Sequence, residues 1–343
     1  MSDFGERIAI LAHGKFPDRA KTATGILRYG DYDVAAVIDR DNAGRRVAEL
    51  RGDLPDAPIV GSMAEAPAVD ALVIGIAPIG GGFDETWRDD VRTAIERGCD
   101  VVAGLHSFLA DDDEFARLAD DHGVALHDVR RPPADLGVAE GRAADVDADV
   151  VLTAGTDCST GKMTTTLELV RAARERGVDA GFVPTGQTGV LIAGWGTVVD
   201  RVIADFAAGA VEDLVCAADE GHEVLFVEGQ GSLTHPAYSG VTLSILHGAR
   251  PDALVLCHAA GREAIHGYES TPIPPVDSVA DLYEDVAAPV AASAVAAGAL
   301  NTGSIEDDDR ARAAVAEYAA DLGAPAADPV RDGPGSLLDA LGY

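Results

Sequence analysis

Short apolar runs alternate with polar stretches of helical spacing in the first part of the chain. Runs of this kind are typical of buried strands, and their alternation with helices predicts a parallel sheet covered on both faces. The expected strands lie at residues 7–14, 34–38, 71–77, 100–105 and 124–129. The expected helices lie at residues 22–29, 85–97 and 113–121. We therefore predict a Rossmann-like α/β domain over residues 1–130.

The same alternation resumes after residue 150. The strands expected there lie at residues 150–154, 179–184, 223–227, 251–258 and 290–300. The helices expected there lie at residues 167–176, 198–206, 307–322 and 336–341. Residues 131–149 contain Pro132-Pro133 and a run of Ala, Asp and Gly without apolar periodicity, which is typical of a linker. Residues 150–343 are therefore predicted to form a second α/β domain.

A phosphate-binding motif begins the second domain. An apolar strand ends at Gly155, a turn leads to Gly161-Lys162, and a helical sequence follows. This is the context that a P-loop requires: backbone N–H groups and the helix N-terminus face the phosphate, and the lysine adds a full positive charge. The residues expected to bind a phosphorylated cofactor are Gly155, Thr156, Asp157, Cys158, Ser159, Thr160, Gly161, Lys162, Met163 and Thr164. The motif thus predicts a P-loop NTPase-like α/β domain.

The motif departs from the common P-loop in two ways. Five residues separate Gly155 from Gly161, where the usual pattern has four. Met163 follows the lysine, at the position where a Ser or Thr hydroxyl normally binds Mg²⁺. Thr164 lies about 100° further round the helix and does not simply replace that hydroxyl. The sequence therefore favours a phosphate site without ordinary magnesium–nucleotide geometry.

A second motif supports the first. The apolar strand at 223–227 ends in Glu228-Gly229-Gln230-Gly231, and a P-loop domain uses such an acid to hold Mg²⁺ or to orient water. His235 continues the same loop and is the general base that the sequence favours. Asp200 belongs to a pair of acids that could hold a metal, act as a base or remain solvated. The expected catalytic residues are Lys162, Glu228, His235 and Asp200, and the expected Mg²⁺ ligands, if Mg²⁺ is used, are Glu228, Asp157 and Thr164.

Other residues are candidates for substrate binding. The stretch from Gly186 to Gly189 follows a strand, and its glycines allow close backbone approach to a ligand. Arg262 follows another strand and suits a carboxylate or phosphate. Lysines are rare in this chain, so those that occur are candidates for ligand-binding roles that the planar guanidinium group of arginine does not fill. The expected substrate-binding residues are Gly186, Gln187, Thr188, Arg262, Lys15 and Lys21.

The first domain lacks a dinucleotide fingerprint. Gly14-Lys15-Phe16 follows its first strand, in place of Gly-x-Gly-x-x-Gly. Asp39 ends the second strand, where an acid would bind a ribose, and His106 follows a later strand at the edge where ligands of such sheets gather. A nicotinamide-type ligand is therefore a weaker alternative for this domain.

The charge balance restricts the partners. The net charge is −32, from 58 acidic and 26 basic residues, and it disfavours binding to nucleic acid. Such acidity is typical of halophilic proteins, in which salt screens self-repulsion. No apolar run approaches the ~20 residues of a membrane span, the N-terminus is no signal peptide, and four scattered cysteines fit a reducing cytosol. We expect a soluble, cytoplasmic homo-oligomer that acts on a small molecule, with no nucleic-acid or membrane partner.

Several stretches together resemble one known family. They are Gly155–Thr166, Pro184–Gly189, Asp200–Gly209, Val227–Gly231 and Pro272–Pro275. The resemblance covers almost the whole chain and indicates a two-domain family of formerly unknown function, with a Rossmann-like N-terminal part and a P-loop C-terminal part. Its members include D-glutamate N-acetyltransferases. The P-loop part is also similar to dethiobiotin synthetase and to amide ligases of cobalamin synthesis.

The resemblance implies transfer of an acetyl group from acetyl-CoA to the amine of a small acidic D-amino acid such as D-glutamate. The P-loop would hold the phosphates of CoA, and His235, Glu228 or Asp200 would accept the ammonium proton. Backbone N–H groups at Gly186–Gly189 or Gly229–Gly231 would stabilise the oxyanion. One alternative is an ATP- and Mg²⁺-dependent ligase or kinase like dethiobiotin synthetase. A second is a nucleotide-binding regulator without catalysis.

Overall fold

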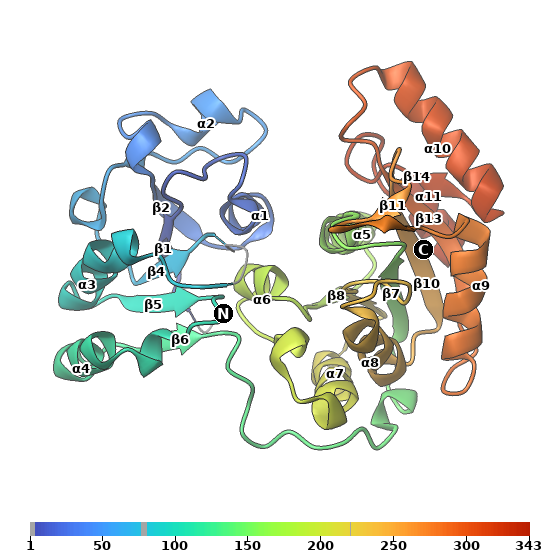
Figure 1. Cartoon of the computed structure of the whole chain (residues 1–343), viewed down its shortest axis with the longest axis horizontal. Helices are drawn as coiled ribbons and strands as arrows, with labels where there is room; N and C mark the ends of the chain where they lie inside the picture. The colour runs from blue at the N-terminus through green and yellow to red at the C-terminus, as the bar shows by residue number, and fades with distance from the viewer. Residues whose placement is uncertain (1–3, 77–80, 220) are drawn as a thin grey trace. The chain divides into compact units, whose positions relative to one another are not determined.

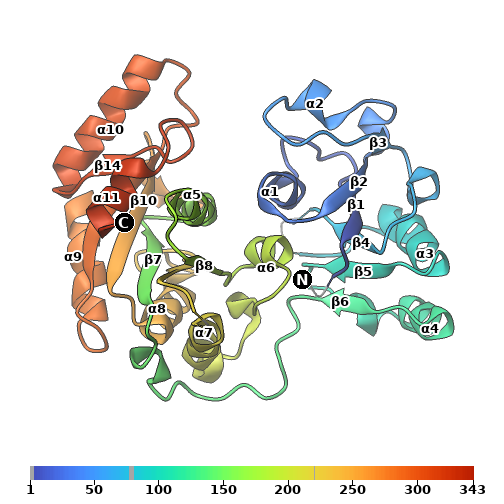
Figure 2. The same ribbon diagram turned by 180° about the vertical axis from the view of Figure 1, so that it is seen from behind.

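The computed structural model describes residues 4–76, 81–219 and 221–343. The chain divides into two compact units, seen from opposite sides in Figures 1 and 2. Unit 1 comprises residues up to Pro132 together with Gln187–Arg201, and unit 2 comprises Pro133–Gly186 and Val202–Tyr343. The end of the strand expected at 71–77, with most of the glycine-rich stretch after it, lies outside the described residues.

Unit 1 contains a parallel sheet with the strand order β3-β2-β1-β4-β5-β6, which is the order of the Rossmann fold. Its strands are β1 (Arg7–Leu11), β2 (Asp33–Ile38), β3 (Ile59–Val60), β4 (Ala71–Ile74), β5 (Asp100–Ala103) and β6 (Leu126–Asp128). The central strands are apolar because both faces of the sheet are covered: all four residues of β4 are buried. The parallel α/β architecture predicted for this part is confirmed.

The helices of unit 1 are α1 (Lys21–Tyr29), α2 (Val47–Leu50), α3 (Arg88–Glu96), α4 (Asp113–His122) and α6 (Gln187–Ala193). Local sequence sets the ends of α4. The side chain of Asp112 accepts hydrogen bonds from the N–H groups of Glu114 and Phe115, and Gly123 ends the helix in the left-handed conformation. The short elements α2 and β3 are absent from the sequence prediction.

Unit 2 contains a second parallel sheet with the order β14-β13-β10-β7-β9-β8. Its strands are β7 (Asp149–Gly155), β8 (Ala180–Val183), β9 (Val224–Val227), β10 (Ala253–Ala259), β13 (Ala294–Asn301) and β14 (Ala326–Ala327). An antiparallel hairpin, β11 (Ala264–Ile265) and β12 (Tyr268–Pro272), follows β10. The strands β7, β9 and β10 are adjacent, so the motifs that end them lie at one edge of the sheet.

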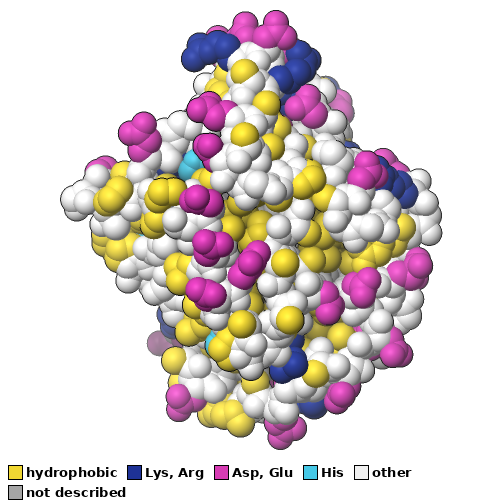
Figure 3. Space-filling view, turned by 90° about the vertical axis from the view of Figure 1, so that its right-hand side faces the viewer, with side chains coloured by type: hydrophobic (Ala, Val, Ile, Leu, Met, Phe, Trp, Pro, Cys, Tyr) yellow, Lys and Arg dark blue, Asp and Glu magenta, His cyan; other side chains and the backbone are white. Residues whose placement is uncertain are grey.

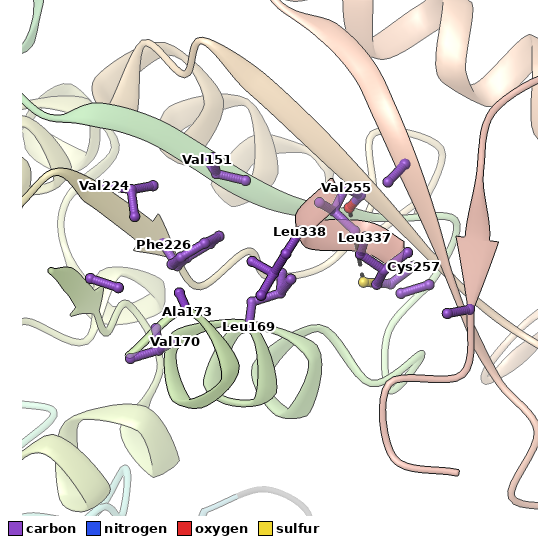
Figure 4. Packing of buried hydrophobic residues seen from close by; sticks show 14 residues of the cluster. Val151, Leu169, Val170, Ala173, Val224, Phe226, Val255, Cys257, Leu337 and Leu338 are labelled. Carbon is purple, nitrogen blue, oxygen red and sulfur yellow. Dashed lines mark hydrogen bonds between the residues drawn. The ribbon is translucent and has the colours of Figure 1, made fainter. Parts of the chain in front are cut away.

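The helices of unit 2 are α5 (Lys162–Glu175), α7 (Ala204–Ala218), α8 (Ser239–Ala249), α9 (Val276–Ala287), α10 (Asp308–Leu322) and α11 (Gly335–Leu341). Leu169 and Val170 of α5 pack with Phe226 of β9 and Leu337 of α11 in one apolar core (Figure 4). This packing fixes α5 against the sheet, and α5 in turn carries Lys162 at its first position.

The helix expected at 198–206 is wrong in its bounds. A 3₁₀ turn at Val199–Arg201 comes first, and α7 begins at Ala204, because the extended backbone of Ile203 separates the two. Asp200 lies in the 3₁₀ turn, where both of its carboxylate oxygens are 2.5 Å from Nη1 of Arg130. This ion pair lies within unit 1.

Gln187–Arg201 packs at the carboxyl edge of the sheet of unit 1, although the sequence pattern assigns it to the second domain. Gln187 donates from Nε2 to Oγ1 of Thr22 at 3.2 Å, and it packs so closely on Gly104 that a Cβ there would lie 1.9 Å from its Oε1. Thr188 and Thr22 share a hydrogen bond of 3.0 Å. Rossmann sheets bind dinucleotides at this edge. In this protein the segment Gln187–Arg201 covers part of that edge.

Asp39 is also engaged within unit 1. One carboxylate oxygen accepts the N–H of Gly14 at 2.7 Å, and the other accepts Nδ2 of Asn42 at 2.7 Å. The acid that would bind a ribose therefore stabilises the turn after β1, and this use disfavours a nicotinamide ligand in unit 1.

The surface is strongly acidic. Figure 3 shows acidic side chains spread over the face that it displays, with fewer basic ones among them. Several arginines pair with neighbouring acids, as Arg312 does with Asp309 on α10. None of the helices in the described part of the chain is long and apolar enough to cross a membrane.

Candidate functional site: a P-loop and the cavity beside it

The loop Thr156–Gly161 joins β7 to α5 in unit 2. Ser159 and Gly161 have positive φ angles of 53° and 102°, with Thr160 between them. Residues in the left-handed conformation that alternate with residues in other conformations are typical of backbone concavities that bind anions. A non-glycine residue such as Ser159 adopts this conformation at a cost, and such strain is common at ligand-binding turns.

Lys162 lies over this loop. Its Nζ donates to the backbone oxygen of Asp157 at 2.7 Å and lies 3.5 Å from Oγ1 of Thr160. Two glycines make room for its buried side chain: a Cβ at Gly155 would lie 2.8 Å from Nζ, and one at Gly229 would lie 3.4 Å from Cδ. A positive charge, a helix N-terminus and backbone N–H groups converge here, and this donor set fits a phosphate.

Asp157 is fully buried in the loop. Its Oδ1 accepts the N–H of Cys158 at 2.7 Å, and its Oδ2 accepts the N–H of His266 at 2.8 Å and Nη1 of Arg262 at 3.1 Å. Arg262 therefore lies beside the P-loop. Both oxygens of Asp157 already accept hydrogen bonds, so this carboxylate is poorly suited to the Mg²⁺ ligation considered from the sequence.

The start of α5 does not present the usual magnesium hydroxyl. Met163 is buried, and Thr164 is half-buried one position further along. Thr166 is also buried, and its hydroxyl lies 2.8 Å from both Oγ1 of Thr153 and the backbone oxygen of Lys162. The residues at this helix end therefore fit a phosphate better than a magnesium nucleotide.

Glu228, at the end of β9, is held by backbone N–H groups. Its Oε2 lies 3.2 Å from the N of Thr185 and 3.1 Å from the N of Gly186. A Cβ at Gly186 would lie 3.0 Å from Oε1, so this position needs glycine for close packing. The N–H of Gly229 donates to Oγ1 of Thr153. The amides of Gly186 and Gly229 therefore already have acceptors within the protein, which disfavours them as oxyanion donors.

His235 is buried against the P-loop. Its Nδ1 accepts the N–H of Ala237 at 3.1 Å, so the neutral ring carries its hydrogen on Nε2. That Nε2 lies 3.9 Å from Oδ1 of Asp157. In this tautomer neither ring nitrogen offers a lone pair to a substrate. Asp157, Cys158 and His235 bring their ligand-type atoms within 4.8 Å of one another, but their hydrogen bonds and the nearby Arg262 disfavour a cation.

The remaining sequence candidates lie in unit 1. Gln187 and Thr188 bond to Thr22, and Asp200 bonds to Arg130. Lys15 is half-buried after β1, and Lys21 begins α1 with an exposed side chain. Unit 2 therefore collects Lys162, Glu228, His235, Arg262 and Gly186. The binding roles expected for Lys15 and Lys21 stay predictions.

Tyr283 is a site residue that the sequence analysis missed. Its hydroxyl donates to the backbone oxygen of Gly155 at 2.9 Å and lies 3.4 Å from the N of Leu233, so it joins the end of β7 to the loop after Glu228. Burial raises the pKa of Tyr283 to about 12, which keeps its hydroxyl protonated. The sequence feature that could have pointed to Tyr283 is the amphipathic stretch Val276–Ala287, which follows a proline pair and forms the helix that carries this residue.

His258 is the second missed residue. It belongs to the end of β10, and its Nδ1 lies 2.7 Å from Oγ1 of Thr156, the first residue of the P-loop. Its ring stacks on Tyr318 with 5.8 Å between centroids and 17° between planes. Burial, followed by the positive charge of Arg262, holds the pKa of His258 below its usual range. The imidazole is therefore neutral at neutral pH.

A cavity of about 430 Å³ adjoins the P-loop in unit 2. One wall carries His258, Arg262 and Glu263, which follow or end β10. The others carry the apolar stretch 273–276, Asp277 at the start of α9 and Asp321 at the end of α10. The cavity therefore joins one arginine and one histidine with three carboxylates and an apolar surface. Two of its lining residues, His258 and Arg262, contact the P-loop residues Thr156 and Asp157.

Known proteins share this architecture over the whole chain. Residues 40–132 match the Rossmann-like "Domain of unknown function (DUF1611_N)", and residues 137–338 match the P-loop "Domain of unknown function (DUF1611_C)". These matches confirm the Rossmann-like and P-loop assignments made from the sequence. A crystal structure of a DUF1611 family protein from Anabaena variabilis is 42% identical and superposes with a TM-score of 0.91, covering 98% of this chain and 99% of that one.

Two curated relatives carry the name D-glutamate N-acetyltransferase. One, from Tritonibacter scottomollicae, is 37% identical over 339 residues, which are 97% of each protein. The other, from a Pseudoalteromonas species, is 39% identical over 283 residues, 82% of this chain and 84% of the relative. These likenesses support an enzyme of the acetyltransferase class and bear out the resemblance found in the sequence. The chain belongs to the DUF1611 family, with a Rossmann-like N-terminal domain and a P-loop C-terminal domain.

Proposed function

We propose that this protein transfers an acetyl group from acetyl-CoA to the amine of a small acidic D-amino acid such as D-glutamate. The names of the two relatives support the reaction class. The observation that carries the proposal for this chain is the P-loop itself, in which Lys162 lies over a concave loop and Met163 replaces the magnesium-binding hydroxyl.

CoA suits such a loop. It carries a diphosphate and a 3′-phosphate, and its reaction releases a thiol without any phosphoryl transfer. The loop therefore needs only to bind and orient phosphate, which N–H groups, a helix N-terminus and Lys162 do. Arg262, beside the loop, adds a second positive charge near the same ligand.

The chemistry is an acyl transfer from sulfur to nitrogen. The substrate ammonium first gives a proton to a base, and the free amine then attacks the thioester carbonyl carbon. A C–N bond forms, the nitrogen loses a second proton and the C–S bond breaks. The CoA thiolate takes up one of the two protons, and the other is released to solvent. The protein supplies the base, holds the two substrates together and keeps water from the thioester.

An ATP-dependent ligase of the dethiobiotin synthetase type is the second candidate. Glu228 favours it, because an acid at the end of the strand beside the P-loop is what such enzymes use with Mg²⁺. In that reaction Lys162 would bind the outer phosphates and a substrate carboxylate would accept the phosphoryl group.

One assay separates the candidates. The protein, with acetyl-CoA and D-glutamate in high salt and without ATP, is expected to release free thiol, which a chromogenic thiol reagent measures. Thiol release that requires ATP, or ADP formation without thiol release, would favour the ligase. If both are absent and ATP or GDP raises the melting temperature, a regulatory nucleotide-binding role replaces both enzymes.

A further inference from the structure

We propose that the cavity beside the P-loop holds the amine substrate and that His258 is the base that takes the ammonium proton. This inference rests on the proposed acetyl transfer and assigns a site and a base to it. The residues that carry it are His258, Arg262, Asp277 and Asp321, which line one cavity.

The hydrogen bonds distinguish His258 from His235. The Nδ1 of His235 accepts a hydrogen bond from the N–H of Ala237, and His235 does not belong to the cavity lining. His258 bonds through Nδ1 to a hydroxyl, Oγ1 of Thr156, which can act as donor or acceptor. When Nδ1–H donates to that hydroxyl, Nε2 keeps a free lone pair. His258 can therefore exist in the tautomer that a base requires.

His258 is tied to the P-loop, so the pantetheine arm of a CoA held there must fold back over the loop to bring the thioester to this base. Thr156, to which it bonds, is the first residue of the P-loop, and the N of Thr156 is in turn held by the backbone oxygen of Cys257. A base tied to this loop keeps a fixed distance from the phosphates that the loop would hold, and the folded arm sets its distance from the thioester. The ring of Tyr318 stacks on the imidazole and holds its orientation.

The cavity lining carries groups of both charges, as an amino acid does. Glu263, Asp277 and Asp321 supply negative charge for an ammonium group, while Arg262 supplies positive charge for a carboxylate. The carboxylates outnumber the arginine, which also pairs with Asp157, so the lining favours the ammonium end of the substrate over its carboxylates. The apolar stretch 273–276 offers a surface for the methylene groups between the charged ends of the substrate.

Several groups set the protonation of His258. Arg262 and the burial of the ring favour the neutral imidazole, and the carboxylate of Asp157 opposes them. Glu263, Asp277 and Asp321 face the same cavity from β10–β11, α9 and α10. A neutral His258 accepts one proton from the ammonium group, and the nitrogen loses a second proton as the amide forms. The CoA thiolate takes up one of the two protons and the other is released to solvent, so the imidazole is regenerated in each turnover.

The first test is kinetic. His258→Gln is expected to lower kcat about 100-fold or more, since general bases contribute about 10²–10⁴-fold, while the KM for acetyl-CoA changes less than about twofold. Added imidazole is expected to restore part of the rate. The acidic limb of the kcat/KM–pH profile should disappear in the variant. His222→Gln, at a half-buried histidine of the same unit that pairs with Asp179 and lies outside the cavity lining, is the matched control.

The second test is binding without catalysis. Calorimetry with D-glutamate alone measures the affinity of the wild type and of Asp277→Asn/Asp321→Asn. The cavity assignment requires at least about tenfold weaker binding by the double variant, with acetyl-CoA binding unchanged as evidence of correct folding. Equal D-glutamate affinity in both proteins overturns the cavity assignment.

The two proposals fail in different ways. Wild-type thiol release with full activity of His258→Gln overturns the role of His258 and leaves the acetyltransferase intact. A wild type without thiol release overturns both the acetyltransferase activity and the role of His258 as base. The D-glutamate titration still tests whether the cavity binds the amino acid. Loss of activity in His258→Gln without imidazole rescue and with an unchanged pH profile assigns the residue to structure and contradicts its role as base.

Discussion

The Nζ of Lys162 donates a hydrogen bond to the backbone oxygen of Asp157, 2.7 Å away. The lysine therefore reaches back over the loop that precedes it and places its charge among the loop's own backbone groups. This contact joins the first residue of α5 to the buried acid that anchors the loop, so the charge and the loop are ordered together.

Replacing Lys162 by Ala is expected to weaken CoA binding about 10- to 100-fold, which corresponds to about 1.4–2.8 kcal/mol. The reason is the loss of the full positive charge at the phosphate site. Calorimetric titration with CoA measures the effect. Arg312→Ala, which removes an exposed charge on α10, should bind CoA as the wild type does. Unchanged affinity in Lys162→Ala would remove the P-loop from the mechanism.

Gly186→Ala is expected to reduce activity at least about tenfold while leaving the protein folded. The added Cβ would lie 3.0 Å from Oε1 of Glu228, so the carboxylate or the Thr185–Gly186 turn must shift. Steady-state thiol release measures the loss. Gly240→Ala on α8 is the control, because a Cβ there meets nothing within 4 Å. Equal activities would mean that the exact placement of Glu228 is unimportant.

Glu212 should control stability at neutral pH. It is buried in α7 and accepts the N–H groups of Glu140 and Gly141 from the linker. Burial opposes its ionisation, but these N–H groups and Arg142 outweigh burial and lower the pKa of Glu212. A depressed pKa stabilises the fold above the unfolded value of about 4.3, and this contribution is lost as pH falls through the folded value.

Glu212→Gln is therefore expected to lower the urea midpoint at pH 7, by roughly 1–3 kcal/mol in unfolding free energy, and to have less effect near pH 3. Urea titrations followed by circular dichroism at the two pH values give the comparison. Glu317→Gln, an exposed acid on α10, is the control. A pH-independent difference between Glu212→Gln and the wild type would contradict the role of this charge.

Salt should stabilise the protein, as its net charge of −32 suggests. The screening length falls from about 10 Å at 0.1 M to about 3 Å at 1 M salt, which reduces repulsion between surface acids. We expect the melting temperature to rise by several degrees between 0.1 and 2 M KCl. Sucrose of equal osmolality, which does not screen charge, should give a smaller rise. A flat or falling curve in KCl would contradict the halophilic interpretation.

The parts of the molecule that local sequence dictates could be predicted. Gly155, Gly161 and Lys162 lie within one strand–turn–helix unit, so their spacing alone predicted the P-loop. Glu228 followed from the end of a neighbouring apolar strand. The adjacency of β7 and β9 in the sheet then brought these residues to one edge.

Long-range contacts could not be predicted in the same way. His258 and Thr156 are 102 residues apart, and only the pairing of β10 with β7 brings them together. His235 follows Glu228 closely in the sequence, which suggested a general base. In the structure, however, its Nδ1 already accepts a hydrogen bond from the N–H of Ala237. Asp200 was expected near the phosphate loop, yet Arg130 pairs with it within unit 1. Local pattern does not record such partners.

The course of Gln187–Arg201 has a consequence for how this protein can be divided. A fragment that stops at Pro132 would leave Thr22 and Gly104 without the residues that cover them, because those residues come from a segment encoded much later. A fragment that starts at Pro133 would carry that segment with nothing to receive it. Neither half is therefore an interchangeable module, and recombination that swaps one half between relatives must preserve the match between this segment and its receiving surface.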